Sequence, residues 1–344
     1  MPRYLCLYLC LGVFASLAQG QAFGAEGQAA GQMDQVERCV LNTVATGASD
    51  TTLREVRDTC RDLQNGAKVP ARIINEKLTE NSAFVITPHR QNYLLPVTHN
   101  AKPNQTPWIE QNVFPGIERP IEHAESKLQI SFKVPLWYQD LFFANDGVYF
   151  GFTMKSYWQV FNEPLSKPFR ETNYRPEVFY QTPIPVSAWD GAFFTRVGFE
   201  HESNGRSQLL SRSWNRIFVG VGFLRERWAL YIQPWYRIPE ERKEDDGDPN
   251  TPPPPDGDDN PDIDDYLGHY EFVAVYNDER YEYSSLVRYS FETGKGGLEL
   301  SASFPLWGRL KGFVQYYQGY GETLIDYNHD VQRIGLGFLL TDLL

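Results

Sequence analysis

Alternation of apolar and polar side chains with a period of two residues is the feature that most limits how this chain folds. In residues 193–203 the odd positions carry Phe, Thr, Val and Phe before His201 and Ser203, whereas the even positions include Arg and Glu. Residues 215–223 repeat the pattern, with Asn215 leading Ile, Val, Val and Phe. Because successive side chains of a strand point to opposite faces, each segment predicts a strand with one apolar face.

The same alternation recurs along the chain from about residue 83 and predicts twelve strands. An even number of antiparallel strands can close into a barrel that leaves no edge exposed to lipid. Aromatic residues make up 15% of the sequence, which fits the aromatic girdles of outer-membrane barrels. We therefore predict an all-β fold, a 12-stranded antiparallel transmembrane β-barrel. Its strands are expected near residues 83–98, 125–137, 147–162, 175–185, 190–203, 211–223, 226–239, 267–277, 280–292, 297–306, 309–320 and 331–342.

The residues between the two alternating segments, 205–211, can close a hairpin. This hairpin would bring His201, Ser203 and Asn215 together at one end, on the face that a membrane barrel turns to lipid. An imidazole can take the proton of a serine hydroxyl, provided that a third group fixes its tautomer and orientation. An Asn carbonyl does so without a charge, whereas a carboxylate facing lipid would be costly to desolvate. We predict a hydrolytic site in which the Gly205 N–H helps to hold the oxyanion.

Six motifs follow one another in order along the chain. They are PFRETNY at 168–174, HESNGRS at 201–207, SRSWNR at 211–216, DNPDI at 259–263, GYGETLIDYN at 319–328 and QRIGLGF at 332–338. Together they resemble the bacterial outer-membrane phospholipase A family, over residues 83–344. The resemblance implies a hydrolase that cleaves acyl esters of phospholipids and lysophospholipids (A1, A2 and lysophospholipase activity) by a Ser-His-Asn acyl-enzyme mechanism.

The resemblance also implies one calcium ion (Ca2+) per monomer and activation by reversible homodimerisation, with each site completed by the other subunit. The implied ligands are the Arg206 carbonyl, the Ser211 hydroxyl, Asp259 and, from the other subunit, the Ser166 carbonyl. Calcium prefers hard oxygen ligands of this kind. Gln208 stands where the family commonly carries an acid, so one auxiliary carboxylate is missing.

The N-terminal residues indicate export. A basic residue precedes a short apolar run and a small-residue cleavage site, so residues 1–20 are predicted to be a signal peptide. Residues 21–80 are predicted to be a periplasmic extension with two short helices, and residues 81–344 form the barrel domain. Cys39 and Cys60 are the cysteines left after cleavage, and in an exported chain we expect them to form a disulfide.

Short predicted turns, such as 188–191 and 277–279, alternate with longer loops. Longer loops of outer-membrane barrels face the exterior, so the site is expected near the outer leaflet. The Asp- and Pro-rich residues 240–265 are predicted to form an extended, solvated loop, because consecutive prolines cannot pair into a sheet.

Two functions without catalysis also fit a barrel. One is a narrow passive channel, although interior Arg and Glu side chains predict a plugged lumen. The other is a structural or adhesive barrel that uses the acidic loop as its contact. The formal net charge of −12 argues against nucleic-acid binding, which needs a basic surface.

Overall fold

Antiparallel strands make up most of the computed structural model. The structure describes residues 86–111, 113–137, 141–143, 145–243, 257–278, 280–308 and 310–343. Its strands are β1 (Thr87–Pro88), β2 (Asn92–Asn100), β3 (Ala124–Trp137), β4 (Gly147–Trp158), β5 (Glu171–Ala188), β6 (Gly191–Ser203), β7 (Ser213–Arg225), β8 (Trp228–Ile238), β9 (Tyr270–Asn277), β10 (Glu282–Tyr289), β11 (Gly296–Trp307), β12 (Leu310–Gly319) and β13 (Val331–Thr341). Its helices are α5 (Thr106–Glu110), η1 (Glu163–Leu165), η2 (Gln208–Leu210) and α6 (Ile263–Leu267).

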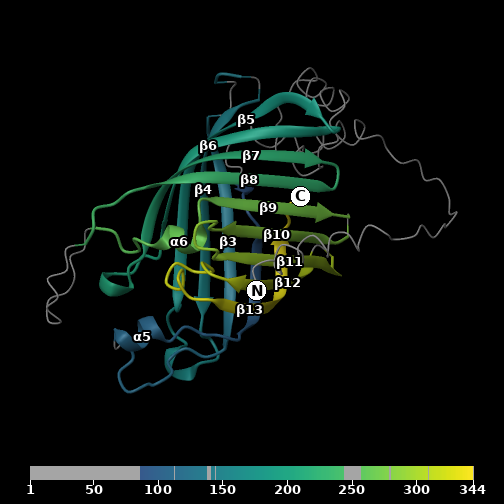
Figure 1. The fold of residues 1–344 in the computed structure, drawn as a ribbon. Coiled ribbons are helices and arrows are strands. Elements are labelled where there is room, and N and C mark those ends of the chain that lie inside the picture. Colours follow the sequence, from purple (N-terminus) through teal and green to yellow (C-terminus); the bar gives the residue numbers. More distant parts are fainter. Residues whose placement is uncertain are drawn as a thin grey trace.

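All of these strands belong to one sheet that closes on itself (Figure 1). From β2 to β13 each strand pairs with its neighbours in sequence, and β13 returns to β2 to complete the ring. The two residues of β1 pair with β3 just beyond the stretch that β2 covers, so they add no separate wall. The protein is therefore a closed 12-stranded antiparallel barrel, and this prediction is confirmed.

Most predicted strand boundaries differ from the observed ones by a few residues. The first strand is the exception, because it is predicted to begin at residue 83 and β2 begins at Asn92. The largest extension is in β5, which runs over Glu171–Ala188 although its alternation predicts only 175–185. The additional residues at its N-terminal end pair with β4, where Tyr157 lies opposite Glu171, and at its C-terminal end Ala188 pairs with Gly191 of β6. Pairing with a neighbour thus prolongs a strand beyond the part whose side chains alternate clearly.

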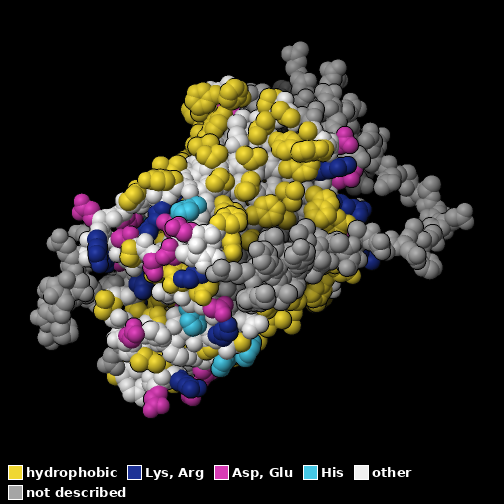
Figure 2. All heavy atoms as spheres, in the orientation of Figure 1, with side chains coloured by type: hydrophobic (Ala, Val, Ile, Leu, Met, Phe, Trp, Pro, Cys, Tyr) yellow, Lys and Arg dark blue, Asp and Glu magenta, His cyan; other side chains and the backbone are white. Residues whose placement is uncertain are grey.

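The outer wall is apolar because alternate side chains of each strand point away from the lumen. On β7, the side chains of Ile217 and Val219 are 48% and 46% exposed. Phe218, which lies between them, and Arg216, which precedes Ile217, are each 1% exposed. Hydrophobic side chains cover much of the strand surface in Figure 2. This is the alternation that residues 215–223 predict.

Charged side chains point into the lumen and pair with one another there. Glu322 accepts hydrogen bonds from Lys127 at 3.0 Å and from Arg333 at 2.8 Å, and all three side chains are at most 2% exposed. Further round the barrel, Glu271 accepts from Arg288 at 2.7 Å. The first group joins the β12–β13 connection to β3 and β13, and the second pair joins the adjacent strands β9 and β10. Interior Arg and Glu side chains therefore pair with one another, as the sequence predicts.

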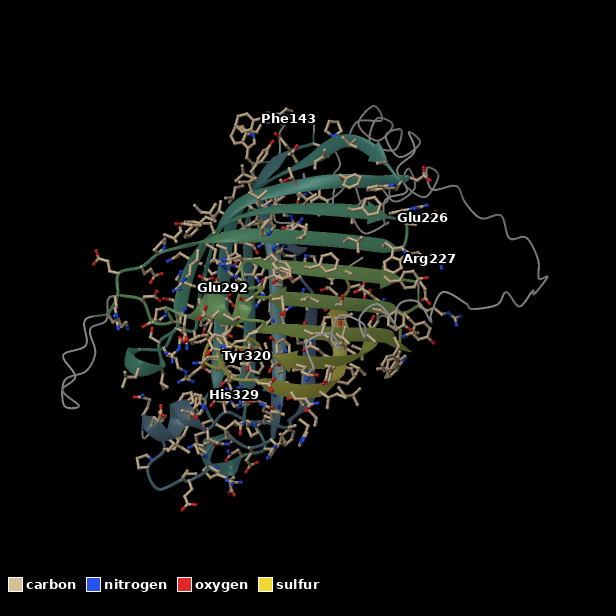
Figure 3. The ribbon with its side chains drawn as sticks, in the orientation of Figure 1. Phe143, Glu226, Arg227, Glu292, Tyr320 and His329 are labelled. Carbon is tan, nitrogen blue, oxygen red and sulfur yellow. The ribbon has the colours of Figure 1, made fainter. Side chains whose placement is uncertain are left out.

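Loops close one end of the barrel, the end where β6 and β12 finish. Figure 3 shows Glu226 and Arg227, in the two-residue β7–β8 turn, at one end and Tyr320 and His329 at the other. At this second end, Ile263 of α6 and Leu324 of the β12–β13 connection pack into one buried cluster with Trp214 and Trp235. The cluster holds the segments that surround the β6–β7 connection.

Several predictions concern residues outside the described ranges. These are the signal peptide at 1–20, the extension at 21–80 with its Cys39–Cys60 disulfide, the domain boundary between residues 80 and 81, and residues 244–256 of the acidic loop. In the part of the chain that the structure describes, no helix is both long enough and apolar enough to cross a membrane.

Candidate active site

The β6–β7 hairpin positions the predicted triad. In its register His201 lies opposite Asn215, and Ser203 lies opposite Ser213. The two-residue period of a strand places Ser203 on the same outer face of β6 as His201. All three predicted residues are half-buried at the end of the apolar wall, so the structure brings them to one place.

A buried side chain, Asn204, organises the connection between the two strands. Its carbonyl accepts the backbone N–H groups of Arg206 at 3.2 Å and Arg212 at 3.0 Å, and its amide donates to the Leu210 carbonyl at 2.8 Å. Asparagine favours such turns because its side chain can hydrogen-bond to nearby backbone. Strand alternation does not mark Asn204, although its place in a polar Ser-Asn-Gly turn is a usable signal.

The His201 ring is held by Asn215. Its Nδ1 lies 2.9 Å from the Asn215 Oδ1, so the ring donates this hydrogen when Nδ1 is protonated. The lone pair is then on Nε2, the atom that can accept a proton. The Asn215 amide in turn donates to Glu240 Oε1 at 2.9 Å, a contact that the sequence analysis missed.

The Ser203 hydroxyl is the less fixed member of the group. Within the described residues, no hydrogen bond joins it to the His201 ring. In ligand-free sites, catalytic hydrogen bonds are often long or misaligned and tighten when substrate binds. The arrangement thus has a positioned base and orienting group, with a hydroxyl two residues away on the same face.

Gly205 has a backbone conformation that few other residues adopt. Its φ is +62°, and an added Cβ would lie 3.2 Å from the Tyr174 ring. In the described part of the chain, no acceptor is hydrogen-bonded to its N–H. This N–H follows Ser203 by two residues and is free to donate to a ligand beside that serine.

Two of the predicted calcium ligands meet directly. The Ser211 hydroxyl donates to Asp259 Oδ2 at 2.6 Å. The other Asp259 oxygen contacts the Lys243 ammonium, a residue that the sequence analysis did not identify. The site therefore offers hard oxygens and already attracts a positive charge, and both properties fit a calcium ion.

The other two predicted ligands have different surroundings. The Arg206 guanidinium stacks over Trp108, 5.2 Å from the ring centre, and donates to the Phe169 carbonyl at 3.2 Å, which anchors the loop that carries the Arg206 carbonyl. The Ser166 carbonyl accepts the Trp158 indole N–H at 2.6 Å. In the described ranges Ser166 has no hydrogen bond to Arg206 or to the Ser211–Asp259 pair.

Only one carboxylate belongs to this predicted ligand set. The described residues contain no group of three or more His, Cys, Asp or Glu side chains arranged to hold a metal ion. The Gln208 side chain lies outside the described part.

The segment that brings Asp259 to the hairpin is itself tied to the barrel. Arg237 contacts both oxygens of Asp258, at 2.6 and 2.7 Å, and the Ser213 N–H donates to Asn260 Oδ1 at 3.1 Å. Burial raises the pKa of the Asp264 carboxyl nearby, although His269 and Arg237 act in the opposite direction. The tethered segment fixes the distance between Asp259 and the β6–β7 connection.

Comparison with known proteins gives one family. The sequence model of the family described as Phospholipase A1 matches residues 69–340. Phospholipase A1 of Escherichia coli K12 is 33% identical over 308 residues, which are 87% of this chain and 94% of that protein. A putative phospholipase A1 of Neisseria meningitidis serogroup B is 37% identical over 261 residues, which are 74% of this chain. These residues span 65% of the Neisseria protein, less than two thirds of its length.

Two solved structures have the same architecture. Outer membrane phospholipase A from Escherichia coli superposes with a TM-score of 0.66 at 33% identity, covering 76% of this chain and all of that chain. The Salmonella typhi outer membrane phospholipase, solved as a dimer with bound calcium, gives a TM-score of 0.66 at 32% identity. That match covers 77% of this chain and 95% of the Salmonella chain.

Proposed function

The chain belongs to the phospholipase A1 family, and from this premise we propose that it hydrolyses acyl esters of phospholipids and lysophospholipids with Ser203, His201 and Asn215. It is a phospholipase and a β-barrel protein of the bacterial outer membrane. The observation that carries the proposed mechanism is the 2.9 Å contact of His201 Nδ1 with Asn215 Oδ1 on the lipid-facing wall.

The proposed reaction uses His201 Nε2, which carries the lone pair, as the proton acceptor. The Ser203 oxygen bonds to the ester carbonyl carbon while its proton passes to His201 Nε2. The carbon–oxygen bond to the lysophospholipid then breaks, and the leaving oxygen takes that proton. A water molecule repeats both steps on the acyl-enzyme and releases the fatty acid. The Gly205 N–H donates to the oxyanion in each half-reaction.

A calcium ion would be held by the Arg206 carbonyl, the Ser211 hydroxyl and Asp259, with the Ser166 carbonyl of the partner subunit. When bound it supplies positive charge beside the oxyanion. The Ser211–Asp259 contact and the Lys243 ammonium at the same carboxylate support this assignment.

We infer that the active form is a reversible homodimer. The Salmonella relative was solved as a dimer. In the described residues, the Ser166 carbonyl of this chain is not hydrogen-bonded to the other implied calcium ligands, so a second subunit could supply it. Exposed apolar side chains line β6 and β7 beside the site, so a second barrel could supply a wall for acyl chains.

The test is release of fatty acid from phospholipid in detergent micelles. Wild type with calcium should release fatty acid, whereas Ser203→Ala and the chelated wild type should not. Ser207→Ala is the matched control, because this exposed serine lies in the same connection outside the proposed triad. Equal rates for Ser203→Ala and wild type would remove the assignment.

A further inference from the structure

Asn215 is hydrogen-bonded on both sides of its amide group. Its Oδ1 faces His201 Nδ1 at 2.9 Å, and its Nδ2 donates to Glu240 Oε1, also at 2.9 Å. The three side chains therefore form a continuous chain of hydrogen bonds along the outer wall, with a carboxylate at its end.

Glu240 reaches this position because of the alternation of β8. Ile238, the last residue of β8, lies opposite Asn215 in the register, and Glu240 continues the same outward face two residues later. Tyr236, two residues before Ile238, is 64% exposed on this face. The carboxylate thus lies past the end of the strand, where its charge remains near water.

Backbone contacts fix the segment that carries Glu240. The Asp258 N–H donates to the Glu241 carbonyl at 2.7 Å, and Arg242 forms a β-bridge with Asp258. Asp258 is held in turn by Arg237. The position of Glu240 is therefore set by the barrel and by the segment that bears Asp259.

An asparagine amide has two ends of nearly equal size but opposite hydrogen-bonding character. If the amide were reversed, its NH2 group would face His201 and favour the tautomer with hydrogen on Nε2, which cannot accept the serine proton. An ionised carboxylate only accepts hydrogen bonds, so it binds the NH2 end alone. The partner of the amide therefore decides which end faces the histidine.

We propose that Glu240 is a positioning residue that orients the Asn215 amide and, through it, the His201 ring. Within the described residues Asn215 is the one hydrogen-bond partner of the Glu240 side chain. This inference rests on the proposed function. Glu240 places a carboxylate behind Asn215, the uncharged third residue of the triad. The negative charge then lies at the rim of the barrel, and the neutral Asn215 amide faces lipid.

The experiment compares Glu240→Met, which removes the acceptor, with Glu240→Gln, which keeps one carbonyl acceptor at the same length. Glu241→Gln is the matched control, because the neighbouring side chain is exposed and uses only its backbone carbonyl. Each variant is made in the full chain, and kcat and KM are measured on phospholipid micelles with saturating calcium. Asn215→Ala is measured with and without Glu240→Met.

Glu240→Met should lower kcat about tenfold, the lower end of the effect of removing a residue that orients a metal ligand by a hydrogen bond, and leave KM within twofold. Glu240→Gln should recover most of the rate, and Glu241→Gln should match wild type. In Asn215→Ala, adding Glu240→Met should change nothing, because its target is gone. Thermal unfolding of the Glu240 and Glu241 variants should match that of wild type, since each replacement is of similar size at a half-exposed or exposed position.

Two results would overturn the inference while the proposed function stands. One is a wild-type kcat for Glu240→Met, and the other is a full additional loss when Glu240→Met is added to Asn215→Ala. Hydrolysis that survives in Ser203→Ala would instead overturn the proposed function, and the inference with it.

Discussion

The Lys243 ammonium contacts one oxygen of the Asp259 carboxylate, and the Ser211 hydroxyl donates to the other oxygen at 2.6 Å. A positive side chain therefore occupies part of the coordination sphere that a calcium ion would use. Calcium and Lys243 should compete for the carboxylate.

Removing this competitor should strengthen calcium binding. Lys243→Met is expected to lower the calcium dissociation constant about two- to fivefold. This fold-change corresponds to the free energy that a partly exposed ion pair contributes. Titration calorimetry of the detergent-solubilised protein measures this without reference to activity. Arg242→Met is the control, because it removes the same charge from an exposed neighbour. Equal calcium affinities for the two variants would show that loss of any nearby positive charge strengthens calcium binding. That result would contradict a specific competition between Lys243 and calcium.

Replacing the neutral member of the triad with an acid should reduce activity. In Asn215→Asp the new carboxylate would stand against Glu240, which now lies 2.9 Å from the Asn215 amide nitrogen. Repulsion between like charges at this distance should turn the group away from His201 and lower kcat about tenfold. Adding Glu240→Gln should restore activity. An Asn215→Asp enzyme as active as wild type would contradict this account.

Gly205→Ala should lower kcat by displacing the oxyanion donor. The φ of +62° costs about 1 kcal/mol for alanine, and the Tyr174 ring 3.2 Å from the added carbon would push the loop away. Gly308→Ala is the control, since Gly308 has a φ of +58° and open space around it. Both variants should lose stability in urea unfolding because of the positive φ, and only Gly205→Ala should lose activity. Equal kcat values would exclude Gly205 from the reaction.

The Glu322 carboxylate should make the barrel less stable at acid pH than at neutral pH. Burial would raise the pKa of this loop carboxyl, but Arg333 and Lys127 outweigh that effect and lower the pKa below its ordinary value of 4.5. Its contribution to stability is therefore complete above pH 4.5 and is lost as the pH falls through the lowered value.

The matched variant for this effect is Glu322→Gln. It should cost about 3 kcal/mol at neutral pH, the lower end for a broken buried pair, because Lys127 and Arg333 keep other partners. The difference in urea midpoint between wild type and variant should shrink as the pH is lowered below 4.5. A difference that stays constant from pH 7 to pH 3 would contradict the assignment.

The sequence predicted the parts of the site that lie within strands. Because side chains alternate strictly, parity alone placed His201 and Asn215 on one face, and the hairpin register then paired them. Contacts between distant segments could not be predicted in this way. Lys127 and Glu322 are 195 residues apart, and no local pattern indicates their pairing.

The connections around the site were predicted least well. Asn204 acts through turn hydrogen bonds that have no period, and Lys243 follows the end of a strand in irregular chain. Glu240 is an intermediate case. It continues the outward parity of β8, so extending the alternation two residues past Ile238 would have found it.

The most direct test of the account is the site of covalent modification by a long-chain alkyl sulfonyl fluoride. The proposed mechanism requires Ser203 on the lipid-facing wall to be an activated nucleophile whose proton His201 accepts. Peptide mass spectrometry after reaction in detergent with calcium should show the sulfonyl group on Ser203 in wild type and no label in His201→Ala. Label on another serine, or equal labelling of Ser203 in wild type and His201→Ala, would contradict it.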